Sequence, residues 1–113
     1  MSFGTVLKDK RREAGVTQRE LAKSIGVDFS YISKLENDRL PPPAADTIVA
    51  IAEVLEVASE ELLAEAGKLP DDVQKSIGES LAAQEFLRDA KDFDLSDEEW
   101  SQMRESLRKL RDD

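Results

Sequence analysis

Residues 17–40 have the sequence TQRELAKSIGVDFSYISKLENDRL, whose first half carries signals for both ends of a short helix. Thr17 is followed three residues later by Glu20, the spacing at which a hydroxyl and a carboxylate each accept a hydrogen bond from the other residue's backbone N–H. The apolar residues that follow recur at helical spacing. Gly26 then stands where a left-handed residue lets the chain turn sharply. The pattern predicts a helix that begins after Thr17 and stops at Gly26.

The second half of this stretch predicts another short helix. Val27 fills the corner between the two helices, and Asp28 or Ser30 caps the second one. Ile32 and Leu35 give it an inward face at helical spacing. Two helices joined by a tight turn that contains Gly form a helix-turn-helix, whose second helix can enter the major groove of DNA. The outward positions of this second helix are Phe29, Ser30, Ser33, Lys34 and Asn37.

The composition limits the kinds of site that the chain can hold. It has 113 residues, no cysteine, no histidine and a formal net charge of −9. The length suits one compact domain with an appendage. Without cysteine or histidine there is no disulfide framework, no thiol metal site and no imidazole to act as a general base. No apolar run approaches the length of a signal peptide core or a membrane span. We expect a cytoplasmic, membrane-free, all-α protein that is not an enzyme and holds no metal or cofactor.

The distribution of charge matters more than its total. Residues 1–39 carry eight basic and six acidic side chains, whereas residues 40–67 carry six acidic and no basic ones. Residues 68–113 carry eight basic and thirteen acidic side chains. Because phosphate neutralisation supplies much of the affinity for DNA, a net negative chain argues against nucleic acid as a partner. However, the positive charge is concentrated around the helix-turn-helix, and this distribution favours DNA as a partner.

Helices are also predicted on both sides of the helix-turn-helix. Phe3–Ala14 forms the first helix, with its basic side chains on the polar face or at its end. Leu40–Pro43 cannot lie inside a helix because proline lacks the N–H and fixes its own φ. Apolar residues at helical spacing resume from Ala44, and Ser59 is expected to cap a short fifth helix. The sequence therefore predicts a five-helix domain over residues 1–67.

Residues 68–113 predict a separate helical region. Apolar residues spaced by four run from Val73 through Leu81 and extend one face up to a break at Asp92–Leu95. Ser96 and Glu99 form a second capping box at the start of a final helix. An apolar seam on that helix has to be buried, either against its own domain or in a second subunit, and we favour the second subunit. The residues predicted to form this dimer contact are Trp100, Met103, Leu107 and Leu110, with Phe86 from the preceding helix.

The stretch from about Leu7 to Ala66 resembles the Xre family, the superfamily of the lambda, Cro and 434 repressors. The resemblance rests on Thr17-Gln18-x-x-Leu21-Ala22, on Gly26-Val27 and on Tyr31-Ile32-Ser33-x-x-Glu36-Asn37. It implies a lambda-repressor-like DNA-binding domain followed by a helical dimerisation or regulatory tail. In that family a basic residue at the position of Arg11 pairs with the glutamate that closes the recognition helix. We therefore expect a structural ion pair between Arg11 and Glu36.

The resemblance also implies which side chains face DNA. Lysine can donate to guanine and a phenyl ring can press against a thymine methyl group. The residues expected to read bases are Phe29, Ser30, Ser33 and Lys34. Those expected to contact phosphates are Gln18, Arg19, Tyr31, Asn37 and Arg39, with Lys10 and Arg12 from the first helix. Simpler alternatives stay open: Phe29 folds onto the core, Gln18 is an ordinary exposed side chain, and the basic run of the first helix is a solvated face. Asp38 replaces a glycine of many relatives, and its acid is expected to weaken binding unless Arg39 offsets it.

The leading interpretation is a transcriptional repressor that binds double-stranded DNA. One small domain buries little DNA surface, whereas a homodimer can read the two halves of a palindromic operator. The sequence segments at residues 86–91 and 95–100 also resemble the C-terminal tails of Xre-type repressors that are paired with metallopeptidases of the ImmA/IrrE kind. This resemblance implies inactivation by cleavage of the tail. One alternative is an antitoxin that autoregulates its operon and binds a toxin through its tail, which a co-purifying small partner would favour. Another is a protein-interaction module without DNA binding.

Overall fold

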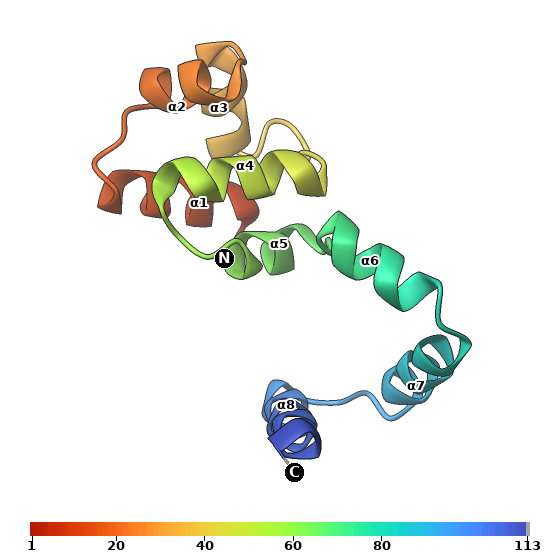
Figure 1. Ribbon diagram of the computed structural model, residues 1–113. Helices are drawn as coiled ribbons and strands as arrows, with labels where there is room; N and C mark the ends of the chain where they lie inside the picture. Colours follow the sequence, from red (N-terminus) through yellow and green to blue (C-terminus); the bar gives the residue numbers. More distant parts are fainter. Residues whose placement is uncertain (113) are drawn as a thin grey trace. The chain divides into compact units, whose positions relative to one another are not determined.

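The computed structural model describes residues 1–112, and all regular secondary structure in that range is α-helical, as expected. The chain forms two compact units, the first being Met1–Gln74 and the second beginning at Lys75. No helix within the described range is both long enough and apolar enough to cross a membrane. The helices are α1 (Phe3–Glu13), α2 (Gln18–Ile25), α3 (Phe29–Glu36), α4 (Ala45–Leu55), α5 (Glu60–Ala66), α6 (Asp71–Gly78), α7 (Leu81–Asp92) and α8 (Asp97–Asp112) (Figure 1).

The predicted signals at both ends of α2 are present in the structure. The Glu20 backbone N–H donates to the Thr17 hydroxyl at 3.0 Å, and the Thr17 N–H donates to the Glu20 carboxylate at 3.2 Å. Gly26 ends the helix in the left-handed conformation with φ of 73°, and Val27 packs against the core at the turn. The two predicted helices therefore form, and their junction is the tight turn that the sequence indicates.

At the start of α3 and of α5, a predicted residue occupies the N-cap position, but the predicted side-chain hydrogen bond is absent. Asp28 occupies the N-cap position of α3, but its side chain makes no capping hydrogen bond, and Ser30 lies inside the helix. Ser59 occupies the N-cap position of α5 with φ of −78° and ψ of −17°, and it too makes no side-chain bond. A hydroxyl cap needs an extended backbone at that position, whereas Ser59 is already helical. These two helices are therefore stabilised by the apolar residues that they bury.

The first unit is built around one apolar core. Helix α1 packs against α3 and α5, and α2 packs against α3 and α4. The inward residues that the sequence predicts for these helices are buried, except Ile25 at the end of α2, which is partly buried and packs against the core. Burial of one such Leu or Ile side chain contributes about 1.5–3 kcal/mol to stability. The largest fully buried side chains are Leu7, Leu21, Ile32, Leu35, Ile48, Ile51 and Leu62.

The proline-rich segment between α3 and α4 is non-helical, as predicted, and is tied to the end of the unit. The Lys68 ammonium group donates to the Pro43 carbonyl at 2.7 Å and to the Pro42 carbonyl at 3.4 Å. Pro43 is buried. The lysine thus satisfies backbone acceptors of a segment whose prolines cannot supply N–H donors of their own.

Asp38 takes the expected left-handed conformation and has a structural role that was not expected. It adopts the left-handed conformation with φ of 56°, as a residue standing in for glycine should. Its carboxylate accepts hydrogen bonds from the Ser2 hydroxyl at 2.6 Å and from the Gly4 N–H at 3.0 Å. The negative charge therefore lies at the N-terminus of α1, where free N–H groups and the helix dipole favour an anion. These hydrogen bonds hold the carboxylate in place but leave its negative charge, so the expected weakening of DNA binding by Asp38 stays a prediction.

The apolar face predicted to run from Val73 through Leu81 is interrupted. Helix α6 ends at Gly78, and α7 begins after Ser80, whose hydroxyl accepts from the Ala83 N–H at 3.1 Å. The Gln84 amide donates to the Gly78 carbonyl at 2.8 Å, which satisfies part of the end of α6. Glycine is a poor helix former and serine is a good N-cap, so the chain breaks here although the apolar spacing continues.

Helix α8 begins as predicted. The Glu99 N–H donates to the Ser96 hydroxyl at 3.2 Å, and the Ser96 N–H donates to the Glu99 carboxylate at 3.0 Å. The Ser96 backbone N–H, and after it the Ser96 hydroxyl, stabilise the charged carboxylate and hold the pKa of Glu99 below its ordinary value. Asp94 takes the left-handed conformation before the cap, with φ of 51°, so the predicted break at Asp92–Leu95 is confirmed.

Candidate nucleic-acid interface

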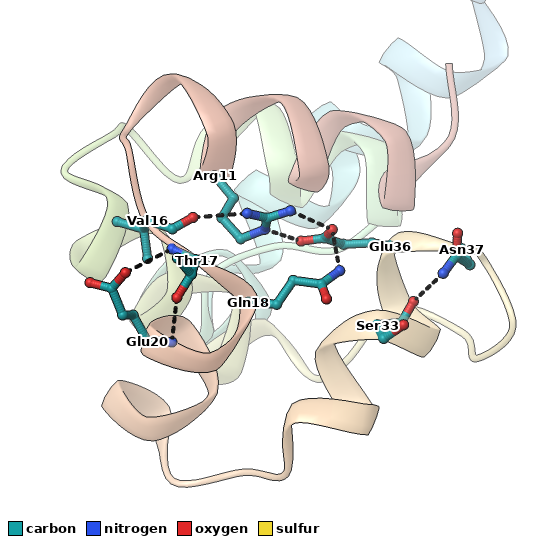
Figure 2. A network of polar contacts seen from close by, with 8 residues as sticks. All are labelled: Arg11, Val16, Thr17, Gln18, Glu20, Ser33, Glu36 and Asn37. Atoms are coloured by element: carbon teal, nitrogen blue, oxygen red, sulfur yellow. Dashed lines mark hydrogen bonds and ion pairs between the residues drawn. The ribbon is translucent and has the colours of Figure 1, made fainter.

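An ion pair at the centre of the first unit joins α1 to the end of α3. The Arg11 Nε lies 2.5 Å from Glu36 Oε2, and its Nη2 donates to Glu36 Oε1 at 3.0 Å (Figure 2). The Arg11 Nη1 donates to the Val16 carbonyl at 2.8 Å. Both side chains are buried, so the pair is a structural element and does not face solvent. The hydrogen bonds to Glu36 raise the pKa of Arg11, although burial of the guanidinium acts in the opposite direction.

Gln18 extends this network to α2. Its side-chain amide donates to Glu36 Oε1 at 2.9 Å, so three helices meet at one carboxylate (Figure 2). The side chain is half-buried, which differs from an ordinary exposed glutamine. One of the two side-chain amide N–H groups is committed to Glu36. A contact of Gln18 with a DNA phosphate would therefore use the second amide N–H or the backbone N–H groups at the start of α2.

The outward face of α3 presents most of the side chains that were predicted to read bases. Phe29 is 40% exposed, so its ring is not part of the core. Ser30 and Lys34 are exposed, and Ser33 is half-buried on the same short helix. Since Ile32 and Leu35 occupy the buried side, the helix offers one polar face with a single aromatic ring at its first residue.

A contact that the sequence interpretation missed joins the starts of α2 and α3. The guanidinium carbon of Arg19 lies 4.5 Å from the centroid of the Phe29 ring, a cation–π arrangement. Arg19 and Phe29 also line an open cleft between the end of α1 and the start of α2, together with Lys8 and Arg12. Arg11 lines the cleft as well, but its charge is paired with Glu36, so three further cations lie around this cleft at the start of α3.

The remaining residues predicted to contact phosphates fall into three groups. Arg12 and Arg39 are exposed. Tyr31 is half-buried and packs against the core, and the Asn37 amide donates to the Ser33 carbonyl at 2.9 Å (Figure 2). Lys10 is engaged elsewhere, as its ammonium group lies 2.7 Å from the Glu61 carboxylate of α5 and its side chain is 17% exposed. We therefore remove Lys10 from the proposed phosphate contacts, because it binds an acid on α5 and does not point to the cleft beside α2.

In the second unit, the residues predicted to form a dimer contact line one apolar groove. Trp100 is 40% exposed and Leu107 is 62% exposed, and their place in one apolar patch is more informative than the exposure of either side chain alone. The ring of Phe86 from α7 joins the same groove. The residues that line it are Phe86, Trp100, Met103, Arg104, Ser106, Leu107 and Leu110.

A helix-turn-helix family model matches residues 7–62. The chain is 35% identical over 77 residues to the uncharacterized HTH-type transcriptional regulator RghRB of Bacillus subtilis, covering 66% of this chain and 55% of that protein. It is 36% identical over 70 residues to the HTH-type transcriptional repressor RghR of Bacillus subtilis, covering 62% and 52% respectively. The chain thus spans about half the length of these curated relatives.

A solved structure is similar to the first unit. It is the crystal structure of SinR, described as the master regulator for biofilm formation, in complex with DNA. The match has a TM-score of 0.50 and 33% sequence identity, and it covers 54% of this chain and 97% of the SinR chain.

Proposed function

The chain belongs to the helix-turn-helix family of the Xre type, and from this premise we propose that it is a sequence-specific transcriptional repressor that binds a palindromic operator as a homodimer. The observation that carries the proposal is the exposed face of α3, with Phe29, Ser30 and Lys34 outward. A helix needs such a free face to insert between the phosphate backbones of the major groove. The similar SinR chain was solved bound to DNA, which supports the same role for this face.

The network around Glu36 supports this proposal by fixing the geometry of the face. A helix that reads base edges has to keep its position relative to the helix that contacts the backbone. Here Gln18 of α2 and Arg11 of α1 both bind the carboxylate that closes α3. The two helices of the motif are thus held by side-chain bonds as well as by the core.

The charge distribution supports a DNA contact despite the net charge of −9. Lys8, Arg12 and Arg19 line the cleft beside α2, and Lys34 is exposed on α3. The acidic residues of 40–67 lie on α4, α5 and the segments around them. Local positive potential at the reading face is what phosphate binding requires, and the acidic remainder of the chain limits binding to DNA without the operator sequence.

The apolar groove of the second unit supports the homodimer. A second copy carries the same groove, and a two-fold axis would bring Trp100 and Leu107 of both copies together. The apolar side chains of each copy would then be buried against those of the other copy, and no other protein would be needed to cover them. Two linked DNA-binding domains also gain affinity, because the second contact becomes intramolecular.

Selection of bound duplexes from random DNA tests the proposal directly. We expect a palindromic site with two half-sites about one helical turn apart. The affinity of the full chain for this site should fall steeply as the salt concentration rises, because bound phosphates release counterions. Absence of any binding at low salt would reject the repressor and favour a protein-interaction module.

Replacement of Lys34 by alanine is expected to weaken operator binding by about 1–3 kcal/mol and to relax base preference at one position of each half-site. The ammonium group is exposed on the outward face of α3, where lysine can donate to guanine O6 and N7. Fluorescence anisotropy on the operator and on random duplex measures both effects. An equal loss on the two duplexes would make Lys34 a phosphate contact. Lys23→Ala, an exposed lysine of α2, is the matched control.

Replacement of Trp100 by alanine is expected to weaken the dimer by about 2 kcal/mol or more, because large aromatic anchors dominate such interfaces. Sedimentation or light scattering over a concentration series should show a shift towards monomer. Leu81→Ala is the matched control, because Leu81 is 75% exposed and does not line the groove. A Trp100→Ala chain that keeps the mass of the dimer at every concentration would reject this assignment.

Peptidase-triggered inactivation stays a prediction within this proposal. The segment between α7 and α8 is accessible, with Phe93 78% exposed. A cut there would separate Phe86 from the rest of the groove and dissolve the dimer. Incubation with a cognate metallopeptidase that leaves the chain between Ala83 and Trp100 intact would argue against it.

A further inference from the structure

Arg19 and Phe29 form a pair whose geometry restricts what the start of α3 can recognise. They come from the first turns of two different helices, yet the guanidinium carbon lies only 4.5 Å from the ring centroid. Phe29 is the first residue of α3 and is 40% exposed. The guanidinium therefore covers one face of the ring, and the rest of the ring stays available to a partner.

The guanidinium over the ring also limits the rotamer freedom of Phe29. An exposed aromatic side chain normally loses rotamer freedom when it docks, which opposes binding. A cation–π contact at an exposed site favours one rotamer before any partner arrives. The N–H groups of a guanidinium lie in its own plane, so a guanidinium that binds a ring through its flat face keeps them available to other acceptors. Arg19 makes no ion pair within residues 1–112, so these donors are free to bind a phosphate.

The chemistry of a phenyl ring narrows the choice of base. The edges of base pairs in the major groove present donors, acceptors and one apolar group, the C5-methyl of thymine. A phenyl ring has no hydrogen-bonding group, so placing it against a polar edge would strip water without replacement. Contact with the thymine methyl group has no such cost. An immobilised ring at the first residue of a recognition helix therefore favours thymine.

We propose that Phe29, held by Arg19, reads the C5-methyl group of one thymine in each operator half-site. The proposal rests on the function proposed above, since it needs α3 to enter the major groove. Phe29 is the specificity-determining residue. Arg19 is a positioning residue that fixes the ring and binds the adjacent phosphate.

Deoxyuridine provides a direct probe, because it differs from thymidine only by the missing methyl group. The full chain is titrated against the selected operator and against duplexes in which each thymine of one half-site is replaced in turn. One replacement should weaken binding about fourfold, the factor that corresponds to about 0.8 kcal/mol for one buried methyl group. The other replacements should change affinity by less than about twofold.

Variants assign that effect to the two side chains. Phe29→Ala should bind thymine and uracil duplexes equally. Arg19→Ala should bind both more weakly and should also reduce the ratio between them to about twofold, because the ring is no longer held. Loss of a phosphate contact alone would lower both affinities and leave the ratio unchanged. Phe93→Ala, which removes an exposed phenyl ring from the second unit, is the control and should keep the fourfold ratio.

The outcomes separate this inference from the function on which it rests. Absence of binding to any duplex at low salt overturns both. Specific binding to an operator with no recurrent thymine, or with no thymine sensitive to uracil, overturns the inference and leaves the repressor intact. A uracil effect that survives Phe29→Ala also overturns it. Because Phe29 is outside the core, circular dichroism of the variant should match that of the parent chain and exclude unfolding as a cause.

Discussion

Replacing Arg11 by methionine is expected to lower the free energy of unfolding of the first unit by about 3–5 kcal/mol, the range for breaking a buried ion pair on one side. Methionine roughly fills the space of the arginine stem but cannot donate. The Glu36 carboxylate, whose side chain is only 1% exposed, would keep one bond from Gln18 and lose its charged partner. Domains of this size have a total stability of about 5–15 kcal/mol, so the loss would be a large fraction of it.

A double variant separates the cost of an unpaired charge from the value of the pair. Arg11→Met with Glu36→Leu removes both charges and should recover most of the lost stability, because apolar replacements of buried pairs are often neutral or better. Urea unfolding followed by circular dichroism measures the difference. Fluorescence of Trp100, the one tryptophan of the sequence, reports on the second unit and should not change. A loss below about 1 kcal/mol in Arg11→Met would show that the pair is well solvated.

The helix-turn-helix was predictable because its signals are local. The capping box needs only Thr17 and Glu20, which are three residues apart, and the tight turn needs only a residue that tolerates positive φ at Gly26. The inward residues follow from helical spacing alone. Even the pair of Arg11 with Glu36 came from the family resemblance, since nothing in the spacing of two residues so far apart indicates a contact.

The sequence did not reveal contacts between residues that are far apart along the chain, because nothing in the local pattern around each residue indicates its partner. Lys10 sits in a basic run that resembles a phosphate-binding surface, and only the packing of α1 on α5 brings it to Glu61. Asp38 was recognised as a left-handed residue, but its bonds to Ser2 and Gly4 span 36 and 34 residues. Arg19 and Phe29 were each assigned a separate role. Their contact depends on the angle between two helices, which no periodicity encodes.

The break between α6 and α7 was missed for a different reason. Apolar residues continue at a spacing of four from Val73 to Leu81, so the periodic signal runs through the break. Gly78 and Ser80 carried the opposing signal, since glycine weakens a helix and serine caps one. The structure follows the backbone preference here, and Leu81 is 75% exposed. An apolar position with little to pack against did not override two residues that favour a helix end.

Substitution of Gly4 is also expected to cause a large loss of stability. Gly4 lies where α1 packs against the end of α3, near the Arg11–Glu36 pair. Glycine inside a helix is unfavourable by about 1 kcal/mol relative to alanine, so a helix position occupied by glycine calls for an explanation. A Cβ added at Gly4 would lie 2.4 Å from the Leu35 carbonyl oxygen, 2.7 Å from the Glu36 carbonyl oxygen and 2.6 Å from Asp38 Oδ1. Two of these atoms belong to the backbone of α3 and its end. They cannot move without shifting the recognition helix.

Replacing Gly4 by alanine is therefore expected to destabilise the first unit by about 3 kcal/mol, because overpacking against fixed backbone outweighs the gain in helix propensity. Gly78→Ala is the matched control, since nothing lies within 4 Å of a Cβ there and the change should be neutral or slightly stabilising. Urea unfolding of both variants measures the difference. Equal stability of the two would mean that α1 slides past the end of α3 at little cost. The variant should then also keep its operator affinity, because the Arg11–Glu36 pair would have adapted to the shift.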